Sequence, residues 1–173
     1  RLCISQRLIS KSNSMLITTK KNQNKLDLIF DNQEAEQVQN FKYLGVILDD
    51  EIKFVAHFKI LMGKLIRALG IFSRAATFLL ASARITLYHT LILPHIDYCS
   101  TVWSNSLRKQ DLSKLQRIQN RGMRIVLGCH PRTHIVDMLD SLKWVSIKQR
   151  FHYNLSIPSL STYSSCFVEI PST

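Results

Sequence analysis

The feature that most constrains the fold is a change in hydrophobic period near residue 50. Before it, residues 41–48 form a compact run of aromatic and β-branched side chains, which predicts a strand in which Gly45 marks a bend or a close approach by another group. After it, apolar residues recur at steps of three and four, which predicts an amphipathic helix that ends near Gly70. The members of this stripe are Ile52, Val55, Phe58, Met62, Leu65 and Leu69.

Further segments extend this division on both sides of residue 50. Short apolar runs separated by a polar turn predict two more strands, at residues 14–19 and 26–30. Helical patterns with Gly128 and Pro94 as stop signals predict three more helices, at residues 81–93, at about 107–127 and at 143–155.

These segments predict an α+β fold in two parts. Residues 1–50 are expected to form a small antiparallel β part, and residues 51–155 an all-helical part. Residues 156–173 are rich in Ser, Thr and Pro without any periodicity, so we expect a disordered tail there.

Charge is distributed unevenly between the two parts. Of the 23 Lys/Arg and 12 Asp/Glu side chains, seven of each lie in residues 1–51, which leaves 16 basic and five acidic side chains in residues 52–173. The whole net charge of +11 therefore belongs to the helical part. Nucleic acid, an acidic membrane surface and an acidic protein are all polyanions that would suit it.

The helix predicted at residues 107–127 combines an apolar stripe with a basic one. The apolar stripe consists of Leu112, Leu115, Ile118, Gly122 and Ile125. Lys114, Arg117, Arg121 and Arg124 recur at the same spacing, roughly 120° around the helix. One face can therefore pack against the protein while its neighbour binds an anion, although Lys and Arg also commonly fill solvated helix faces.

Cysteine usage and hydropathy favour an intracellular, soluble protein, in the nucleus or the cytoplasm. The four cysteines lie far apart without a C-x-x-C pair, and no leader precedes Arg1. The longest apolar stretch without charged residues, at 85–96, is too short to cross a bilayer and is interrupted by His89 and Pro94. We expect no membrane partner.

Several phrases of the chain occur in an order that is known from one family. Residues 41–49 read F-K-Y-L-G-V-I-L-D, and residues 91–98 read L-I-L-P-H-I-D-Y. There follow V-W at 102–103, L-Q-R-I-Q-N-R at 115–121, L-K-W at 142–144 and K-Q-R at 148–150. Across residues 8–155, this series resembles the reverse transcriptases of jockey-like and related non-LTR (LINE-type) retrotransposons.

The resemblance implies a place near the end of the palm and in the thumb of a right-hand polymerase. Residues 41–45 would be the primer grip, a palm hairpin that holds the primer terminus, and the following helices would be the thumb, which touches the duplex backbone. The implied partners are an RNA template and a DNA primer, paired as a hybrid duplex, and an upstream fingers and palm half. The nucleic-acid-binding residues expected from the resemblance and the charge are Phe41, Lys42, Tyr43, Leu44, Gly45, Lys64, Arg67, Lys114, Arg117, Arg121 and Arg124.

The polymerase active site is not expected in this chain. The family's chemistry needs Mg²⁺ held by an aromatic-x-Asp-Asp box and an earlier Asp, and neither precedes Phe41. The pair Asp49-Asp50 follows the primer grip, so we interpret it as the start of a helix, where carboxylates suit the positive end of the helix dipole. We expect no catalytic residue, no bound metal or cofactor and no polymerase activity from this part of an RNA-directed DNA polymerase alone.

Two other groups of side chains are weaker candidates for a functional site. Cys129, His130 and His134 are close in sequence. A tetrahedral zinc site requires four ligands, however, so we predict no zinc site here. Tyr88, Tyr98 and Trp103 could stack on bases, but aromatic residues beside an apolar run are more typical of a core.

Two alternative interpretations of the function, from other classes of protein, remain open. A basic helical module could bind an acidic protein or a membrane surface through its amphipathic helices. The chain could also derive from a decayed element copy that has no function. The ordered phrases favour the first interpretation, a polymerase fragment that binds primer and template.

Overall fold

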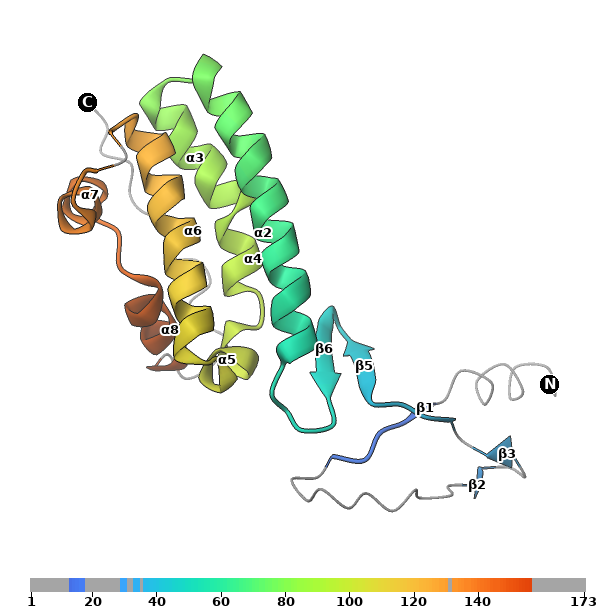
Figure 1. The fold of residues 1–173 in the computed structure, drawn as a ribbon. Coiled ribbons are helices and arrows are strands. Elements are labelled where there is room, and N and C mark those ends of the chain that lie inside the picture. The colour runs from blue at the N-terminus through green and yellow to red at the C-terminus, as the bar shows by residue number, and fades with distance from the viewer. Residues whose placement is uncertain (1–12, 18–28, 31–32, 35, 131, 157–173) are drawn as a thin grey trace.

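The structure, a computed structural model, describes residues 13–17, 29–30, 33–34, 36–130 and 132–156. Short strands precede a set of packed helices (Figure 1), and the predicted α+β class is therefore confirmed. The predicted tail lies outside the described residues, except for Ser156, which ends the last helix.

The strands are short and pair two by two. They are β1 (Asn13–Ser14), β2 (Ile29–Phe30), β3 (Gln33–Glu34), β4 (Glu36–Gln37), β5 (Asn40–Tyr43) and β6 (Val46–Asp49). β1 pairs with β4 in parallel, whereas β2 with β3 and β5 with β6 are antiparallel. Of the predicted strand at residues 14–19, residues 15–17 are not in a strand and 18–19 lie outside the described residues. Of the one at 26–30, only the last two residues are described, and they form β2.

Residues 41–48 form a hairpin, so the prediction of one continuous strand there was wrong. β5 and β6 pair in the register Phe41 with Leu48 and Tyr43 with Val46. Leu44 and Gly45, between them, have φ values of 45° and 86°. Positive φ at both central residues is the geometry of a type I′ turn, whose twist matches the strands it joins. The chain therefore reverses at Gly45, where the residue pattern predicted a bend or a close approach within one strand.

The first long helix, α2 (Val55–Ala75), begins and ends later than its sequence pattern suggested. One carboxylate oxygen of Asp49 accepts a hydrogen bond from the Lys53 amide (2.6 Å), and the other accepts one from the Val55 amide (3.2 Å). This contact holds residues 50–54 in a turn, so Ile52 and Val55 are exposed and do not belong to the buried stripe.

The helix also runs past Gly70, which was expected to end it. Phe72 is fully buried beyond that glycine, and Ala76 is buried after it. Burial of these apolar side chains favours continuation of the helix by more than the weak helix propensity of one glycine opposes it.

The remaining helices pack beside α2. They are the 3₁₀ turn η1 (Ala76–Phe78), α3 (Ala81–Leu91), α4 (Leu93–Asp97), α5 (Ser100–Trp103), the 3₁₀ turn η2 (Ser104–Ser106), α6 (Lys109–Leu127), α7 (Ile135–Leu142) and α8 (Ile147–Ser156). The helix predicted at 81–93 breaks at Ile92, because Pro94 lies in the first turn of α4, where its missing N–H is tolerated. Gly128 ends α6 with a φ of 63°, as predicted. α7 was not predicted.

The core lies where α2, α3 and α6 run side by side (Figure 1). Fully buried side chains come from each of these helices and from the short elements that follow them. They include Leu65, Phe72, Tyr88, Ile96, Trp103, Leu115 and Ile147. The helical part is thus a closed bundle that presents its remaining helix faces to solvent.

Gly122 is the residue that lets α3 and α6 approach each other. A Cβ atom built on Gly122 would overlap the Tyr88 ring, and its distance to the Tyr88 Cδ2 atom would be 2.9 Å. The ring cannot move away freely, because it stacks on Trp144 with centroids 4.5 Å apart and meets Phe72 edge-on. Glycine is therefore required here for packing.

We predict that Gly122→Ala lowers the free energy of unfolding by about 1–3 kcal/mol through overpacking. Gly63→Ala is the matched control, since nothing lies within 4 Å of a Cβ there and Gly63 is also inside a long helix. That control should raise stability by about 0.5–1 kcal/mol. Urea unfolding of both variants measures this, and equal shifts in the two would contradict the packing argument.

Candidate nucleic-acid interface

One solvent-exposed stripe of α2 combines two apolar and three basic side chains. Its positions are separated by four, three, four and three residues, which places them on one narrow face of the helix. All five are exposed, and the two isoleucines are 47% and 52% accessible. The stripe consists of Ile60, Lys64, Arg67, Ile71 and Arg74. The three cations make no hydrogen bond or ion pair to another residue of the described part.

The basic stripe expected on α6 is present, but its members differ in availability. Arg117 and Arg121 are exposed. Lys114 forms an ion pair with Asp111 at 2.8 Å and lies 5.9 Å from the centre of the Phe58 ring on α2. Arg124 is half-buried, and its buried Nε atom has no hydrogen-bond partner in the described part. Arg117 and Arg121 are therefore the members best placed to meet an external anion.

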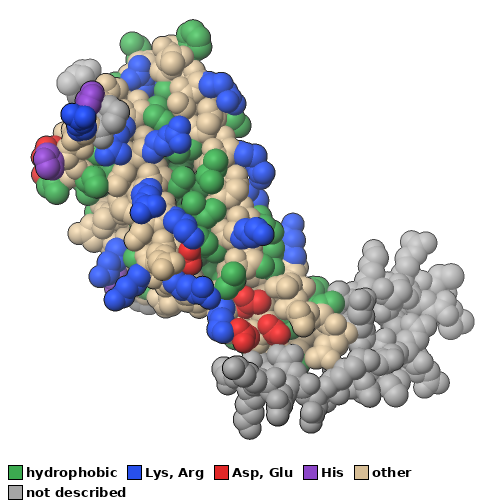
Figure 2. Space-filling model, viewed as in Figure 1, with side chains coloured by type: hydrophobic (Ala, Val, Ile, Leu, Met, Phe, Trp, Pro, Cys, Tyr) green, Lys and Arg blue, Asp and Glu red, His purple; other side chains and the backbone are tan. Residues whose placement is uncertain are grey.

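The two helices present their cations on one side of the molecule. Figure 2 shows Lys and Arg side chains over α6 and along the edge formed by α2, with acidic side chains gathered near the start of α2. The sequence explains why this surface is positively charged, because residues 52–96 contain six Lys/Arg and no Asp or Glu. We call the exposed surface of Lys64, Arg67, Arg74, Arg117 and Arg121 the basic face.

The β5–β6 hairpin is anchored to the helical part by Tyr98, just after α4. The Tyr98 hydroxyl donates a hydrogen bond to the Leu44 carbonyl at 2.5 Å, and the Trp103 indole N–H donates to the Tyr98 carbonyl at 3.0 Å. A Cβ on Gly45 would lie 3.4 Å from Tyr98 Cε1. The hairpin tip is thus fixed in position, while the predicted grip side chains Phe41, Lys42, Tyr43 and Leu44 are exposed.

A pocket of about 450 Å³ lies where the hairpin meets α2 and α4. Lys42, Gly45 and Lys64, all predicted binding residues, line it together with His57 and His95. Burial, and secondly the Lys64 charge, lower the pKa of His57, so this imidazole is neutral at pH 7. Its Nδ1 accepts a hydrogen bond from the Ile47 amide at 3.4 Å. The two lysines therefore make the pocket positive.

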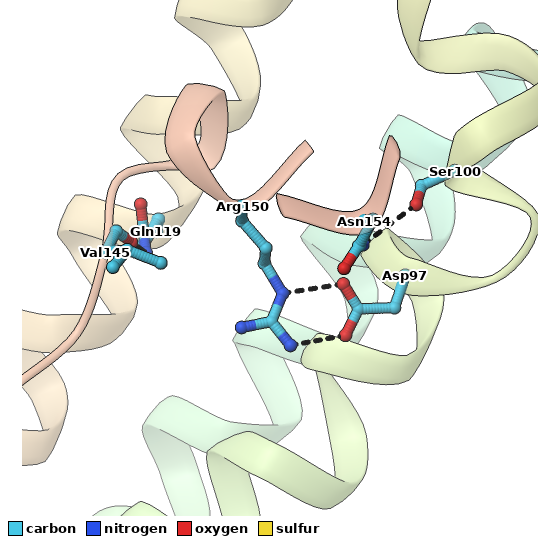
Figure 3. A network of polar contacts seen from close by, with 6 residues as sticks. All are labelled: Asp97, Ser100, Gln119, Val145, Arg150 and Asn154. Carbon is cyan, nitrogen blue, oxygen red and sulfur yellow. Dashed lines mark hydrogen bonds and ion pairs between the residues drawn. The ribbon is translucent and has the colours of Figure 1, made fainter. Parts of the chain in front are cut away.

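The phrases that carry the family resemblance meet inside the helical part. Arg150 of α8 donates two hydrogen bonds of 2.6 Å to the Asp97 carboxylate, and the Asn154 amide donates to the Ser100 hydroxyl at 3.1 Å (Figure 3). The residues of the D-Y and K-Q-R phrases thus hold α8 against the end of α4 and the start of α5. In the structure, these contacts position α8 relative to α4 and α5.

The glutamines of α6 do the same for the segment between α7 and α8. Gln119 is buried and donates to the Val145 carbonyl at 2.8 Å (Figure 3). The Gln116 amide group donates to the side-chain oxygens of Gln119 and Asn120, and its own oxygen accepts the Ile147 amide at 3.0 Å. These bonds satisfy buried polar groups, which would otherwise cost stability.

The carboxylates and cysteines considered for metal binding have other contacts. Asp49 caps the turn before α2, and Cys129 Sγ lies 3.6 Å from Met138 Sδ. Within residues 13–17, 29–30, 33–34, 36–130 and 132–156, no group of three or more potential ligands could hold a metal ion. Of the three aromatic residues, Tyr88 and Trp103 are buried in the core, whereas Tyr98 is 53% exposed.

The sequence patterns missed Arg74 as part of the basic face, and they missed Ile60 and Ile71 as members of the exposed stripe on α2. The signal was present as a second set of three- and four-residue steps on α2, but the apolar stripe on the buried side dominated the pattern. Arg124 was expected on this face and is half-buried, because it lies close to the packed end of α6.

We expect Tyr98→Phe to loosen the hairpin without unfolding the helices. Loss of one hydrogen bond to the Leu44 carbonyl should speed amide exchange in β5 and β6 by about fivefold. Tyr153→Phe removes an exposed hydroxyl from α8 and is the matched control. Hydrogen-exchange mass spectrometry compares the two, and an unchanged hairpin in Tyr98→Phe would show that this bond does not anchor it.

Within the described residues, no helix combines the length and the hydrophobicity that a membrane crossing requires. Comparison with known proteins finds no match to this chain among protein-family models, curated proteins or solved structures. The resemblance to reverse transcriptases therefore stays a prediction from the sequence phrases.

Proposed function

We propose that this chain binds a nucleic-acid duplex through its basic face, as the palm-end and thumb portion of a non-LTR retrotransposon reverse transcriptase. The observation that carries the proposal is a set of exposed cations on two adjacent long helices, Lys64, Arg67, Arg74, Arg117 and Arg121, none of which forms an ion pair within the described residues. The ordered phrases of the sequence support the assignment to this family, and the basic face supports binding through the phosphate backbone.

The dimensions of α2 fit the backbone of a duplex. A helix of 21 residues is about 30 Å long, and each strand of a duplex advances by about 3.4 Å along the duplex axis for each phosphate. A duplex aligned with α2 therefore spans roughly nine phosphates of each strand over that length, and those on the facing side can meet the basic face. Arg117 and Arg121 on the neighbouring helix widen the contact. Such contacts give affinity and orientation without reading the base sequence.

The hairpin supports a second contact at the same end of the helices. Lys42 and Lys64 flank one pocket from the hairpin and from α2, so a strand that follows the basic face passes close to the hairpin. Tyr98 fixes the hairpin tip relative to that path. A rigid tip suits the role that the resemblance implies for residues 41–45, which is to hold the end of a primer strand.

The proposed role is binding and positioning rather than catalysis. Asp49, the last residue of the hairpin, accepts the amide hydrogen bonds that cap the turn into α2. Polymerisation by such an enzyme would need Mg²⁺ and carboxylates supplied by the upstream fingers and palm half. This chain would contribute the grip on the RNA template and DNA primer.

Reversing the charges of Arg117 and Arg121 should weaken hybrid binding for all base sequences alike. We expect Arg117→Glu with Arg121→Glu to lower the affinity for an RNA/DNA hybrid by at least about tenfold. The salt dependence should fall by about one unit of slope for each lost phosphate contact. Fluorescence anisotropy with two hybrids of unrelated sequence measures both effects.

Arg132→Glu is the matched control, because Arg132 is exposed in the segment between α6 and α7 and does not belong to the basic face. It changes the net charge in the same direction, but it should leave the affinity nearly unaltered. The double α6 variant reverses two charges and this control reverses one. If the control lowered the binding free energy by half as much as the double variant, the overall charge and not the basic face would be responsible.

A further inference from the structure

The turn between α2 and α3 displays two large apolar side chains almost completely to solvent. Phe78 is 92% exposed and Leu80 is 80% exposed, the highest values for large apolar side chains in the described part. Figure 2 shows hydrophobic side chains projecting at this end of the helices. Full exposure of two such neighbours costs free energy in the isolated protein, so they point to a partner.

This turn has a defined structure. The Leu79 amide donates to the Ala76 carbonyl at 3.3 Å, and the Arg84 guanidinium Nε donates back to the Leu79 carbonyl at 2.9 Å. The Thr77 hydroxyl donates to the Arg74 carbonyl at 2.8 Å. Main-chain and side-chain bonds thus hold Phe78 and Leu80 in place, which reduces the entropy that binding would have to overcome.

The pair lies at the end of the basic face. Phe78 follows Arg74 by four residues and so continues the spacing of the exposed stripe that begins at Ile60. Arg74 and Arg84 flank the turn, and no carboxylate occurs in residues 52–96. An apolar turn with flanking arginines and no acidic residue near it in the sequence suits an anionic partner that also has an apolar cavity or gap.

We infer that Phe78 and Leu80 form an apolar wedge that enters the minor groove of the bound duplex and partly unstacks one base step. The inference rests on the proposed function, because the duplex must first lie along the basic face. Apolar side chains such as Phe and Leu, next to Arg, are the groups that proteins insert between base pairs from the minor groove. The phosphates near the wedge would meet Arg74 and Arg84.

The distribution of charge favours a duplex over a lipid surface. A bilayer that bound the turn between α2 and α3 would contact the arginines beside this turn. It would not contact Lys64, Arg67, Arg117 and Arg121, which lie farther along the helices. A duplex aligned with α2 meets those side chains and the turn together. The wedge therefore completes a contact that begins near the hairpin and continues along the whole helix.

The experiment uses the full chain with an RNA/DNA hybrid that contains a fluorescent adenine analogue, whose emission rises when it unstacks. Wild-type protein should raise the emission at one or a few positions of the analogue. Phe78→Ala and Leu80→Ala should each abolish most of that rise and lower the affinity by about tenfold, with an unchanged salt slope. Both side chains are exposed, so neither variant should change the unfolding midpoint.

Val136→Ala is the control, since Val136 is 67% exposed on α7, outside the basic face. If wild type binds the hybrid with strong salt dependence but Phe78→Ala keeps full affinity and emission, the wedge is wrong and the proposed function stands. If wild type binds no hybrid, the proposed function fails as well. Tighter, Phe78-dependent binding to phosphatidylserine vesicles than to the hybrid would assign the turn to a membrane and overturn the inference.

Discussion

The arrangement depends above all on the pair of hydrogen bonds between Arg150 and Asp97. This bidentate contact joins α8 to the end of α4, and the adjacent Tyr98 in turn holds the hairpin tip at the Leu44 carbonyl. Charge-assisted, bidentate geometry restricts orientation as well as distance. The hairpin is also joined to α2 directly, because the Asp49 carboxylate accepts the Lys53 and Val55 amides and the Ile47 amide donates to His57. A binding surface that spans the hairpin and the helices requires these fixed relations.

The helical part was largely predictable because its apolar periodicity is strong. Gly128 and Pro94 marked real boundaries, and Leu65, Leu69, Leu115 and Ile118 are buried as their spacing indicated. The errors arose where local signals opposed tertiary contacts. Gly70 did not end α2 because Phe72 is buried beyond it, and residues 41–48 formed a hairpin because Leu44 adopts a positive φ that its residue type does not favour.

The candidate site was only partly predictable, because spacing places a side chain on a face but does not reveal its partners. Lys114 and Arg124 belong to the same stripe as Arg117 and Arg121, yet one is paired with Asp111 and the other is half-buried. Some residues of the phrases that suggest the family link elements to one another, such as Gln116, Gln119 and Arg150. Arg117 and Arg121 belong to the same phrases but are exposed on the basic face, so the phrases combine packing residues with candidate binding residues.

The salt dependence of hybrid binding tests the central claim most directly. If a duplex lies on the basic face, Lys64, Arg67, Arg74, Arg117 and Arg121 replace the counterions that are condensed on its phosphates. The logarithm of the association constant should then fall linearly with the logarithm of the salt concentration, with a slope of about −4.5, from about 0.9 for each phosphate neutralised. A slope near zero, or no measurable binding at low salt, would contradict the account.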